Sequence, residues 1–424
     1  MRYQKTRLKN GATVLCAPEN RTKAVTLLIL FGVGSRHEST SLNGIAHFIE
    51  HLVFKGTPKR PSTLHISQEL DSMGAEYNAM TAKDFTGYYI KVSHQKMNKA
   101  SDILFDMILN SLFDKKMLQQ EKKVIIEEIN MYEDNPLMYL GDLFEQTVYG
   151  KKSKLGQLIS GPKSNIKALN RTKVLNFMKR FYHPGNMVVV GSGHINSPQL
   201  VNLTEKYISG LSQKKRTAFQ KEKVTQSKPQ LSLLNRKTEQ VQIGLGFPAY
   251  SYFDKDIYAL EVLSNILGGM MSSRLFIEIR VKRGLAYFIN SSLNIYQDTG
   301  NLMIQAGLDK SRINLAIAAI LDQLKIVKKE GVTVQELKKA KDNLTGKLIL
   351  KIEDSESVAS YLAKQYLLTK RIITPQQLIK KIKAVRQQDI KRVANDIFQN
   401  KKINLALIGP FADKSPFAKL LKID

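Results

Sequence analysis

The chain has 424 residues, of which 43% are apolar, so it is long enough for two domains with sizeable cores, and its composition excludes a disordered protein. Its 65 lysine and arginine residues outnumber 37 acidic residues and give a formal net charge of +28. These basic residues are spread along helical stretches, and no nucleic-acid-binding motif appears. We therefore expect no nucleic-acid partner and keep a basic nucleic-acid-binding protein as a less favoured alternative.

The sequence contains no apolar run of the length of a signal peptide or of a membrane-spanning helix. Its one cysteine, Cys16, lies in an expected strand and has no partner for an internal disulfide, so we interpret it as a small buried apolar residue. These features predict a soluble cytoplasmic protein without a membrane partner.

The first half of the chain is predicted to alternate strands with helices. Strands are expected near 12–17 and 24–32, a helix with two histidines within 44–57, a helix near 63–73, two strands within 74–92, helices near 95–112 and 116–133, and a closing strand within 186–195.

The second half is predicted to repeat this order. A strand at 241–249 comes first, followed by a helix at 256–269, a mixed segment at 272–290, a strand at 299–308, helices at 311–324 and 333–348, and a strand at 403–411. Two short matches support the repeat. The pair Thr86-Gly87 recurs as Thr299-Gly300, and Gln120-Glu121 recurs as Gln335-Glu336. We infer a duplication of about 210 residues.

The repeat predicts an α+β fold of two tandem homologous domains, each an antiparallel-rich sheet packed with helices. We place the N-terminal domain at 1–210 and the C-terminal domain at 229–424. Residues 211–228 are polar, lysine-rich and weakly periodic, which is typical of a linker.

The segment "GIAHFIEHLVFKGT" contains the most informative residues of the chain, His47, Glu50 and His51. On a helix, residues four apart share a face, so both imidazoles can reach one ion, with Glu50 beside them. Two imidazoles, a carboxylate and a water make an open catalytic zinc site. The alternative is two hydrogen-bonded histidines on a partly buried helix. The corresponding helix in the second half has no histidine, so the pair is expected to form a site in one half only.

The third ligand should be a carboxylate on another helix. In the helix expected at 116–133, Glu121 and Glu128 are seven residues apart and therefore lie on nearly one face, with Val124 and Ile125 between them. A carboxylate on an apolar face is costly unless it is paired or bound to metal. This geometry favours Glu128 and leaves Glu127, about 100° away, as an alternative.

With these segments the chain resembles the inverted zincins, whose signature is H-x-x-E-H. It is most similar to the M16 (pitrilysin/insulysin) family, in the M16B-like branch related to the mitochondrial processing peptidase and to bacterial zinc proteases of that type. The resemblance covers essentially the whole chain. It is carried by "GIAHFIEHLVFKGT", "EKKVIIEE", "GAEYNAMT", "FYHPGNMVVVGSGHI" and "GGMMSSRLFIEIRVKRGLAYF". It implies a LuxS/MPP-like metallohydrolase fold.

The resemblance also implies roles for individual residues. His47, His51 and Glu128 would bind one Zn²⁺ per chain, Glu50 would be the general base on the metal-bound water, and Glu121 would support the site without binding the metal. Asn78 and Ala79 would pair with the bound peptide, and Arg280 and Tyr287 would contact the substrate near the scissile bond.

The role of Arg280 and Tyr287 is physically reasonable because a tetrahedral oxyanion needs donors aimed at it. The alternative for these two residues is an ordinary salt bridge for Arg280 and packing within a strand for Tyr287.

The motifs and the resemblance together imply a zinc-dependent endopeptidase that cuts peptides or unfolded segments in a closed chamber. Long family members build the chamber from four such domains, so a two-domain chain is expected to form a homodimer with a composite active site. The alternative is a non-catalytic partner subunit of a heterodimeric peptidase. The remaining histidines have no partner at ligand spacing in the sequence and are expected to form no site. They are His37, His65, His94, His183 and His194.

Overall fold

The computed structural model of the protein describes residues 1–215 and 217–423. It forms two compact units, each built from three segments of the chain. Unit 1 comprises Met1–Asn130, Gln157–Gln220 and Ile349–Thr374, and unit 2 comprises Met131–Gly156, Lys221–Leu348 and Pro375–Asp424. Residue 216 of the predicted linker lies outside the described residues. The described remainder of 211–228 contains no helix or strand.

Unit 1 contains a six-stranded sheet in the order β1-β2-β6-β3-β5-β4, in which only the β2–β6 pair is parallel. Its strands are β1 (Gln4–Arg7), β2 (Thr13–Pro18), β3 (Ala24–Phe31), β4 (Glu76–Thr81), β5 (Thr86–Ser93) and β6 (Met187–Gly193). Strand β4 forms one edge of this sheet.

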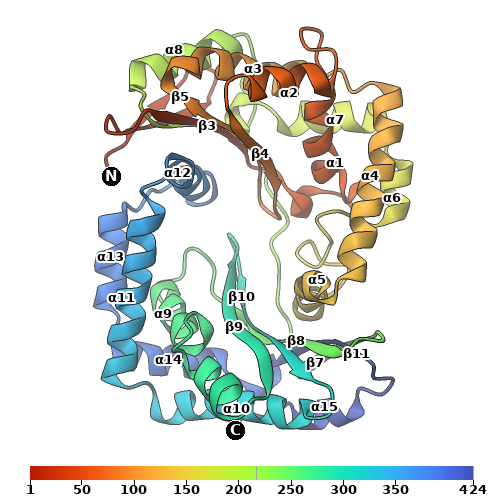
Figure 1. The fold of residues 1–424 in the computed structure, drawn as a ribbon, viewed down its shortest axis with the longest axis vertical. Coiled ribbons are helices and arrows are strands. Elements are labelled where there is room, and N and C mark those ends of the chain that lie inside the picture. Colours follow the sequence, from red (N-terminus) through yellow and green to blue (C-terminus); the bar gives the residue numbers. More distant parts are fainter. Residues whose placement is uncertain (216, 424) are drawn as a thin grey trace. The chain divides into compact units, whose positions relative to one another are not determined.

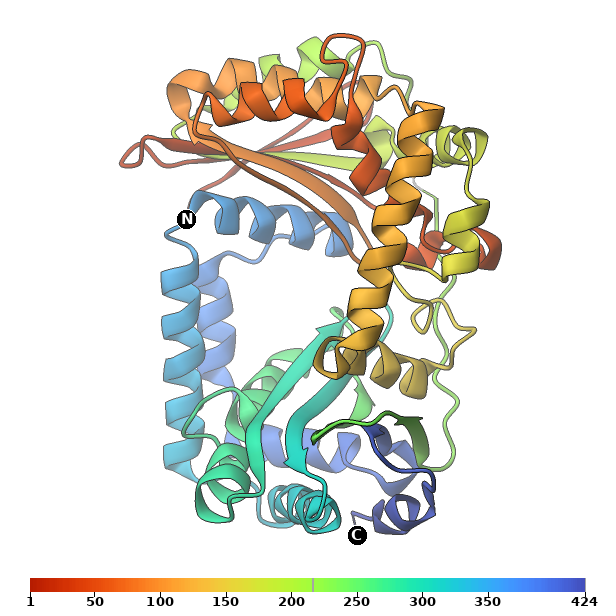
Figure 2. The same ribbon diagram turned by 45° about the vertical axis from the view of Figure 1, so that its right-hand side comes forward.

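Helices cover both faces of this sheet. One face packs against α1 (Ile45–Leu52), α2 (Thr63–Asp71), α3 (Met97–Asn110), α4 (Lys115–Asp134), α6 (Lys163–Ala168), α7 (Arg171–Phe181) and α8 (Ser197–Ile208). The other face packs against α12 (Ser355–Thr369), which Figures 1 and 2 show in blue beneath the sheet. In β3, Leu27 and Ile29 face the first layer, and Leu28 and Leu30 face α12. This burial on both faces explains the unbroken apolar run of β3.

Unit 2 contains a five-stranded sheet in the order β7-β11-β8-β10-β9, with only β7 and β11 parallel. Its strands are β7 (Gln230–Asn235), β8 (Gln240–Ala249), β9 (Ala286–Ile295), β10 (Gly300–Asp309) and β11 (Asn404–Gly409). One face packs against α9 (Ile257–Gly268), α10 (Ile313–Glu330), α11 (Val334–Lys351), α13 (Pro375–Ala384), α14 (Gln387–Ile397) and α15 (Ser415–Leu420). The other face packs against α5 (Pro136–Tyr149).

Four neighbouring strands have the same spatial order in both sheets. The order is β6-β3-β5-β4 in unit 1 and β11-β8-β10-β9 in unit 2. The predicted α+β fold with two antiparallel-rich sheets is therefore confirmed.

The compact units differ from the continuous ranges 1–210 and 229–424 at two helices. Helix α5, from the first half of the sequence, packs in unit 2, and α12, from the second half, packs in unit 1. None of the described helices is long and apolar enough to cross a lipid bilayer.

Candidate metal centre

Helix α1 carries the histidines, and a buried carboxylate fixes where it begins. Glu38, 1% exposed, accepts hydrogen bonds of 2.8 Å from the backbone N–H groups of Gly44 and Ala46 and from Asn43 Nδ2. Gly44 precedes the helix in the left-handed region, at φ 101°, where a side chain would be strained. Burial raises the pKa of Glu38 to about 7, although these hydrogen bonds oppose the shift.

The buried and open faces of α1 then follow from its sequence. Phe48, Ile49 and Leu52 are buried in the core of unit 1. His47 and His51 stand together on another face, with ring centroids 4.7 Å apart and ring planes at 73°. The predicted neighbouring position of the two imidazoles is therefore present in the structure.

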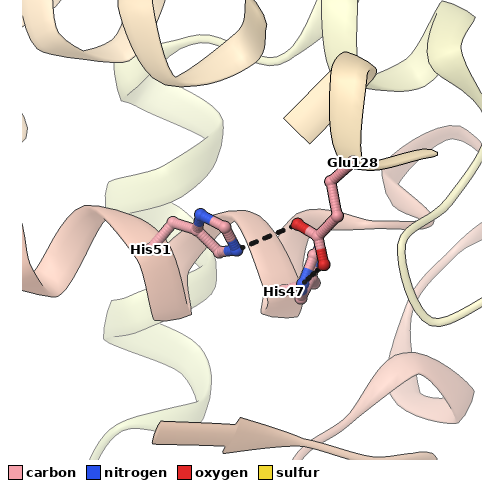
Figure 3. Close-up of side chains that lie close together, drawn as sticks. All are labelled: His47, His51 and Glu128. Carbon is pink, nitrogen blue, oxygen red and sulfur yellow. Dashed lines mark ion pairs between the residues drawn. The ribbon is translucent and has the colours of Figure 1, made fainter. Parts of the chain in front are cut away.

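Glu128 of α4 reaches both histidines, as Figure 3 shows. Its Oε1 lies 3.7 Å from His47 Nε2, and its Oε2 lies 3.4 Å from His51 Nε2. One potential ligand atom from each of the three residues lies within 4.8 Å of the others. Bonds of about 2.0–2.2 Å to a tetrahedral zinc ion place ligand atoms about 3.3–3.6 Å apart. The two distances from Glu128 lie close to this range, so the donor types and these distances suit this ion.

The surroundings of Glu127 and Glu128 show which of the two candidate ligands lies near the histidines. Glu127 is exposed and accepts a hydrogen bond from Asn130 Nδ2, whereas Glu128 faces the histidines with its side chain 25% exposed. Val124, expected on the apolar face beside Glu128, is 52% exposed, while Ile125 is buried. The face that carries Glu128 is therefore open to solvent at its rim, which leaves access to the three ligand atoms.

Glu121, one helical repeat before Glu128, orients His51. Its Oε1 lies 2.8 Å from His51 Nδ1. Its Oε2 forms an ion pair with Lys55 Nζ, and these two atoms are 2.7 Å apart. Burial would raise the pKa of Glu121, but the hydrogen bonds with His51 and Lys55 outweigh it and lower the pKa. A histidine whose second nitrogen is bound to a carboxylate is the usual arrangement of a metal ligand. Lys55, four residues after His51 on the same helical side, was missed by the sequence analysis.

The two histidines differ in their proton affinity. Burial, followed by the charge of His51, lowers the pKa of His47 to about 4, so this ring is neutral at neutral pH. Burial also acts to lower the pKa of His51, but its hydrogen bonds with Glu121 and Glu128 raise it to about 9. His47 Nδ1 is buried and has no hydrogen-bond partner among the described residues. Glu121 thus supports one histidine of the pair and not the other.

Glu50 lies beside this cluster without joining it. Its carboxylate accepts a hydrogen bond from the Thr81 hydroxyl, at the end of β4. Burial raises the pKa of Glu50, and the Thr81 hydrogen bond opposes that shift. Thr81 was also missed by the sequence analysis, because a threonine in a strand carries no signal of a distant partner.

Asn78 and Ala79 lie in β4, the edge strand that ends at Thr81. Ala79 is opposite Tyr88 of β5 in the ladder. The Ala79 N–H donates to the side-chain Oδ1 of Asn78 at 2.8 Å, and the Asn78 side chain is exposed. The two residues that were predicted to pair with a bound peptide therefore lie on an edge strand of the sheet, near Glu50.

Arg280 and Tyr287 belong to unit 2 and are no part of the cluster on α1 and α4. Arg280 lies in a π-helical turn, Phe276–Lys282, and Tyr287 lies in the edge strand β9. The guanidinium carbon of Arg280 is 4.7 Å from the Phe276 ring centroid and 6.0 Å from that of Tyr287. Tyr287 is 71% exposed, and Arg280 forms no ion pair within the described chain. The alternative of a salt bridge and strand packing does not describe this pair.

Two family models match the sequence of this chain. Residues 13–163 match the family model for insulinase (peptidase family M16), and residues 168–344 match the model for the peptidase M16 inactive domain. All residues of the metal cluster fall in the first match. The second match includes α9, which has no histidines.

Relatives of similar length carry zinc protease names. "Uncharacterized zinc protease YmxG" of Bacillus subtilis is 34% identical over 408 residues, 95% of this chain and 97% of that protein. An uncharacterized zinc protease of Streptomyces coelicolor is 33% identical over 417 residues, 97% of this chain and 90% of the relative.

Two solved structures share the fold. A protease from Helicobacter pylori has a TM-score of 0.88 at 25% identity, covering 96% of this chain and 99% of that chain. A peptidase M16 inactive domain from Pseudomonas fluorescens has a TM-score of 0.89 at 18% identity, covering 98% and 100%.

The contact between Glu121 and His51 generates a testable prediction. We expect Glu121→Gln to weaken zinc binding about 10–100-fold, because a neutral amide holds the imidazole less firmly than a carboxylate. The affinity can be measured by competition with a chromophoric chelator. Glu127→Gln, on the exposed side of the same helix, is the matched control and should bind zinc as the wild type does. Equal affinities for the two variants would contradict the orienting role of Glu121.

Proposed function

The chain belongs to peptidase family M16, and on this premise we propose that it is a zinc-dependent endopeptidase that cuts peptides or unfolded polypeptide segments. The observation that supports the proposal is the convergence of His47, His51 and Glu128, whose donor atoms lie within 4.8 Å of one another. When bound there, zinc would lower the pKa of a coordinated water to about 7 and polarise the carbonyl of the substrate.

In this proposal Glu50 is the general base. It lies one residue before His51 on α1, stays outside the ligand set and keeps its carboxylate in place through the Thr81 hydroxyl. It would accept a proton from the attacking water and pass it to the leaving amine. Burial raises the pKa of Glu50 above its usual range, which makes its carboxylate a stronger base for the first transfer.

The edge strand β4 would hold the substrate by adding a strand to the sheet. The Ala79 N–H now donates to Asn78 Oδ1, and in this proposal a substrate carbonyl would take the place of that side-chain oxygen. A bound peptide would take over this hydrogen bond and release the exposed Asn78 side chain to contact the substrate. Because β4 also carries Thr81, the same strand would position both the peptide and the general base.

Arg280 and Tyr287 would stabilise the oxyanion of the tetrahedral intermediate. Both are available for this role, because Tyr287 is 71% exposed and the guanidinium group of Arg280 lies over the rings of Phe276 and Tyr287.

We further propose a homodimer in which unit 2 of one chain completes the site on unit 1 of the other and encloses the substrate in a chamber. A non-catalytic partner subunit is less favoured, since the ligand set, Glu50 and the arginine–tyrosine pair are all present in this one chain.

The first test of this function is removal of the metal. We expect the purified chain to cleave an unfolded model protein, to lose this activity with a chelator and to regain it with zinc. Glu128→Gln should lower hydrolysis by about 10²-fold or more, because a ligand is lost, whereas Glu127→Gln should stay close to the wild type. Hydrolysis that persists after chelation, or that survives Glu128→Gln, would exclude the proposed site.

A mixing experiment tests the composite dimer. Glu50→Gln and Arg280→Ala proteins are each expected to be nearly inactive. After subunit exchange, half of the dimers in an equal mixture are mixed, and each has one site with neither lesion. Recovery should therefore approach about a quarter of the wild-type activity.

The control for this experiment is a mixture of Glu50→Gln with His51→Ala. Both lesions then lie in the metal-binding half, so each site of a mixed dimer carries one of them, and no activity should return. If the first mixture stays inactive although exchange is demonstrated, the composite dimer is wrong.

A further inference from the structure

Two histidines that are 100 positions apart in the sequence lie together in unit 1, away from the metal cluster on α1. His94 directly follows β5, and His194 directly follows β6, on either side of the first residues of β3. Their ring centroids are 4.2 Å apart and their planes are tilted by 35°. Residue spacing gives these two histidines no partner, and they meet because the sheet brings together two strand ends that are far apart in the sequence.

Hydrogen bonds fix the orientation of both rings. His94 Nδ1 lies 3.1 Å from the carbonyl oxygen of Lys23, and His194 Nδ1 lies 3.1 Å from that of Thr22. The backbone N–H groups of His94 and His194 also donate to this segment, at the carbonyls of Lys23 and Ala24. The segment before β3 thus holds both residues by main chain and side chain.

These contacts also settle which ring nitrogen carries the proton. A carbonyl oxygen can only accept, so each Nδ1 must donate and carries the hydrogen when the ring is neutral. The lone pair of each neutral ring is then on Nε2. Neither Nε2 has a hydrogen-bond partner among the described residues, and both side chains are partly exposed. An imidazole whose Nδ1–H is bound to a backbone carbonyl is in the usual state of a metal-binding histidine.

From this arrangement the geometry points to a second metal site, at which His94 and His194 together bind one late first-row transition-metal ion through their Nε2 atoms. The ring centroids are 4.2 Å apart, as against 4.7 Å for His47 and His51, so one ion between the rings would be within reach of both once each Nε2 turns toward it. Two imidazoles and water suit Cu²⁺, Ni²⁺ and Zn²⁺, with Cu²⁺ bound most tightly. Two protein ligands make this site weaker and more open than the three-ligand cluster, and it depends on neither the peptidase activity nor the dimer.

The experiment uses the full chain with the first cluster disabled by His47→Ala and His51→Ala, so that the remaining site can be titrated alone. Cu²⁺ binding is measured by calorimetry and by the absorption band of the bound ion. We expect one equivalent to bind, and His94→Phe or His194→Phe to weaken this binding by more than about tenfold. Phenylalanine keeps an aromatic ring in the stack but has no nitrogen, so a role limited to packing would tolerate it.

His65→Phe in the same background is the matched control, since His65 is an exposed histidine of unit 1 whose Nδ1 contacts only the Ser62 hydroxyl. It should bind Cu²⁺ as the background protein does. Thermal unfolding of each variant shows whether the fold is kept, and His94→Gln gives a second, smaller replacement. If folded His94→Phe or His94→Gln binds as much Cu²⁺ with the same affinity as the background, the pair is a packing contact and the site does not exist.

Discussion

The candidate centre depends on the pairing of the partly buried polar groups around His51 and at the start of α1, because such groups are costly to bury unpaired. His51 is held by Glu121, and Glu121 is itself held by Lys55. The helix that carries both histidines begins at three hydrogen bonds to the buried carboxylate of Glu38. These charges and hydrogen bonds set the position of α1 against α4, and with it the distances from Glu128 to the two imidazoles.

The two sheets have the same order of four neighbouring strands but carry different side chains at their edges. The edge strands β4 and β9 occupy equivalent places in the two sheets. In the first sheet the edge strand carries Asn78, Ala79 and Thr81, whose hydroxyl contacts Glu50 of α1. In the second sheet the edge strand carries the exposed Tyr287 next to Arg280. The second copy keeps an apolar helix, α9, where the first has its histidines, so the sheet and its core do not need them. In the proposed function, the first edge strand binds the peptide and the second contributes to oxyanion stabilisation, on two copies of one scaffold.

Residue spacing along the helices was sufficient to predict that His47, His51 and Glu128 lie together. It was not sufficient to predict the residues that contact this group from other elements. Histidines four apart and glutamates seven apart fix their own geometry within a helix, so the cluster could be predicted with Glu127 left as the alternative. The pairing of Thr81 with Glu50, and of His94 with His194, depends on the order of strands in the sheet, which residue spacing does not encode. The positions of α5 and α12 were missed for a similar reason, because an amphipathic helix shows which face is apolar and not which sheet covers it.

The central claim is that Glu50 acts on a water beside a metal that other residues hold. The most direct measurement compares the tightly bound zinc content and the rate of peptide hydrolysis of the wild type and of Glu50→Gln, both loaded with zinc and dialysed. The account predicts equal zinc content and a fall in kcat of about 10²–10⁴-fold, because the amide binds no proton while the ligands are intact. Full hydrolysis by Glu50→Gln, or loss of its zinc together with its activity, would contradict the assignment of Glu50 as the general base outside the ligand set.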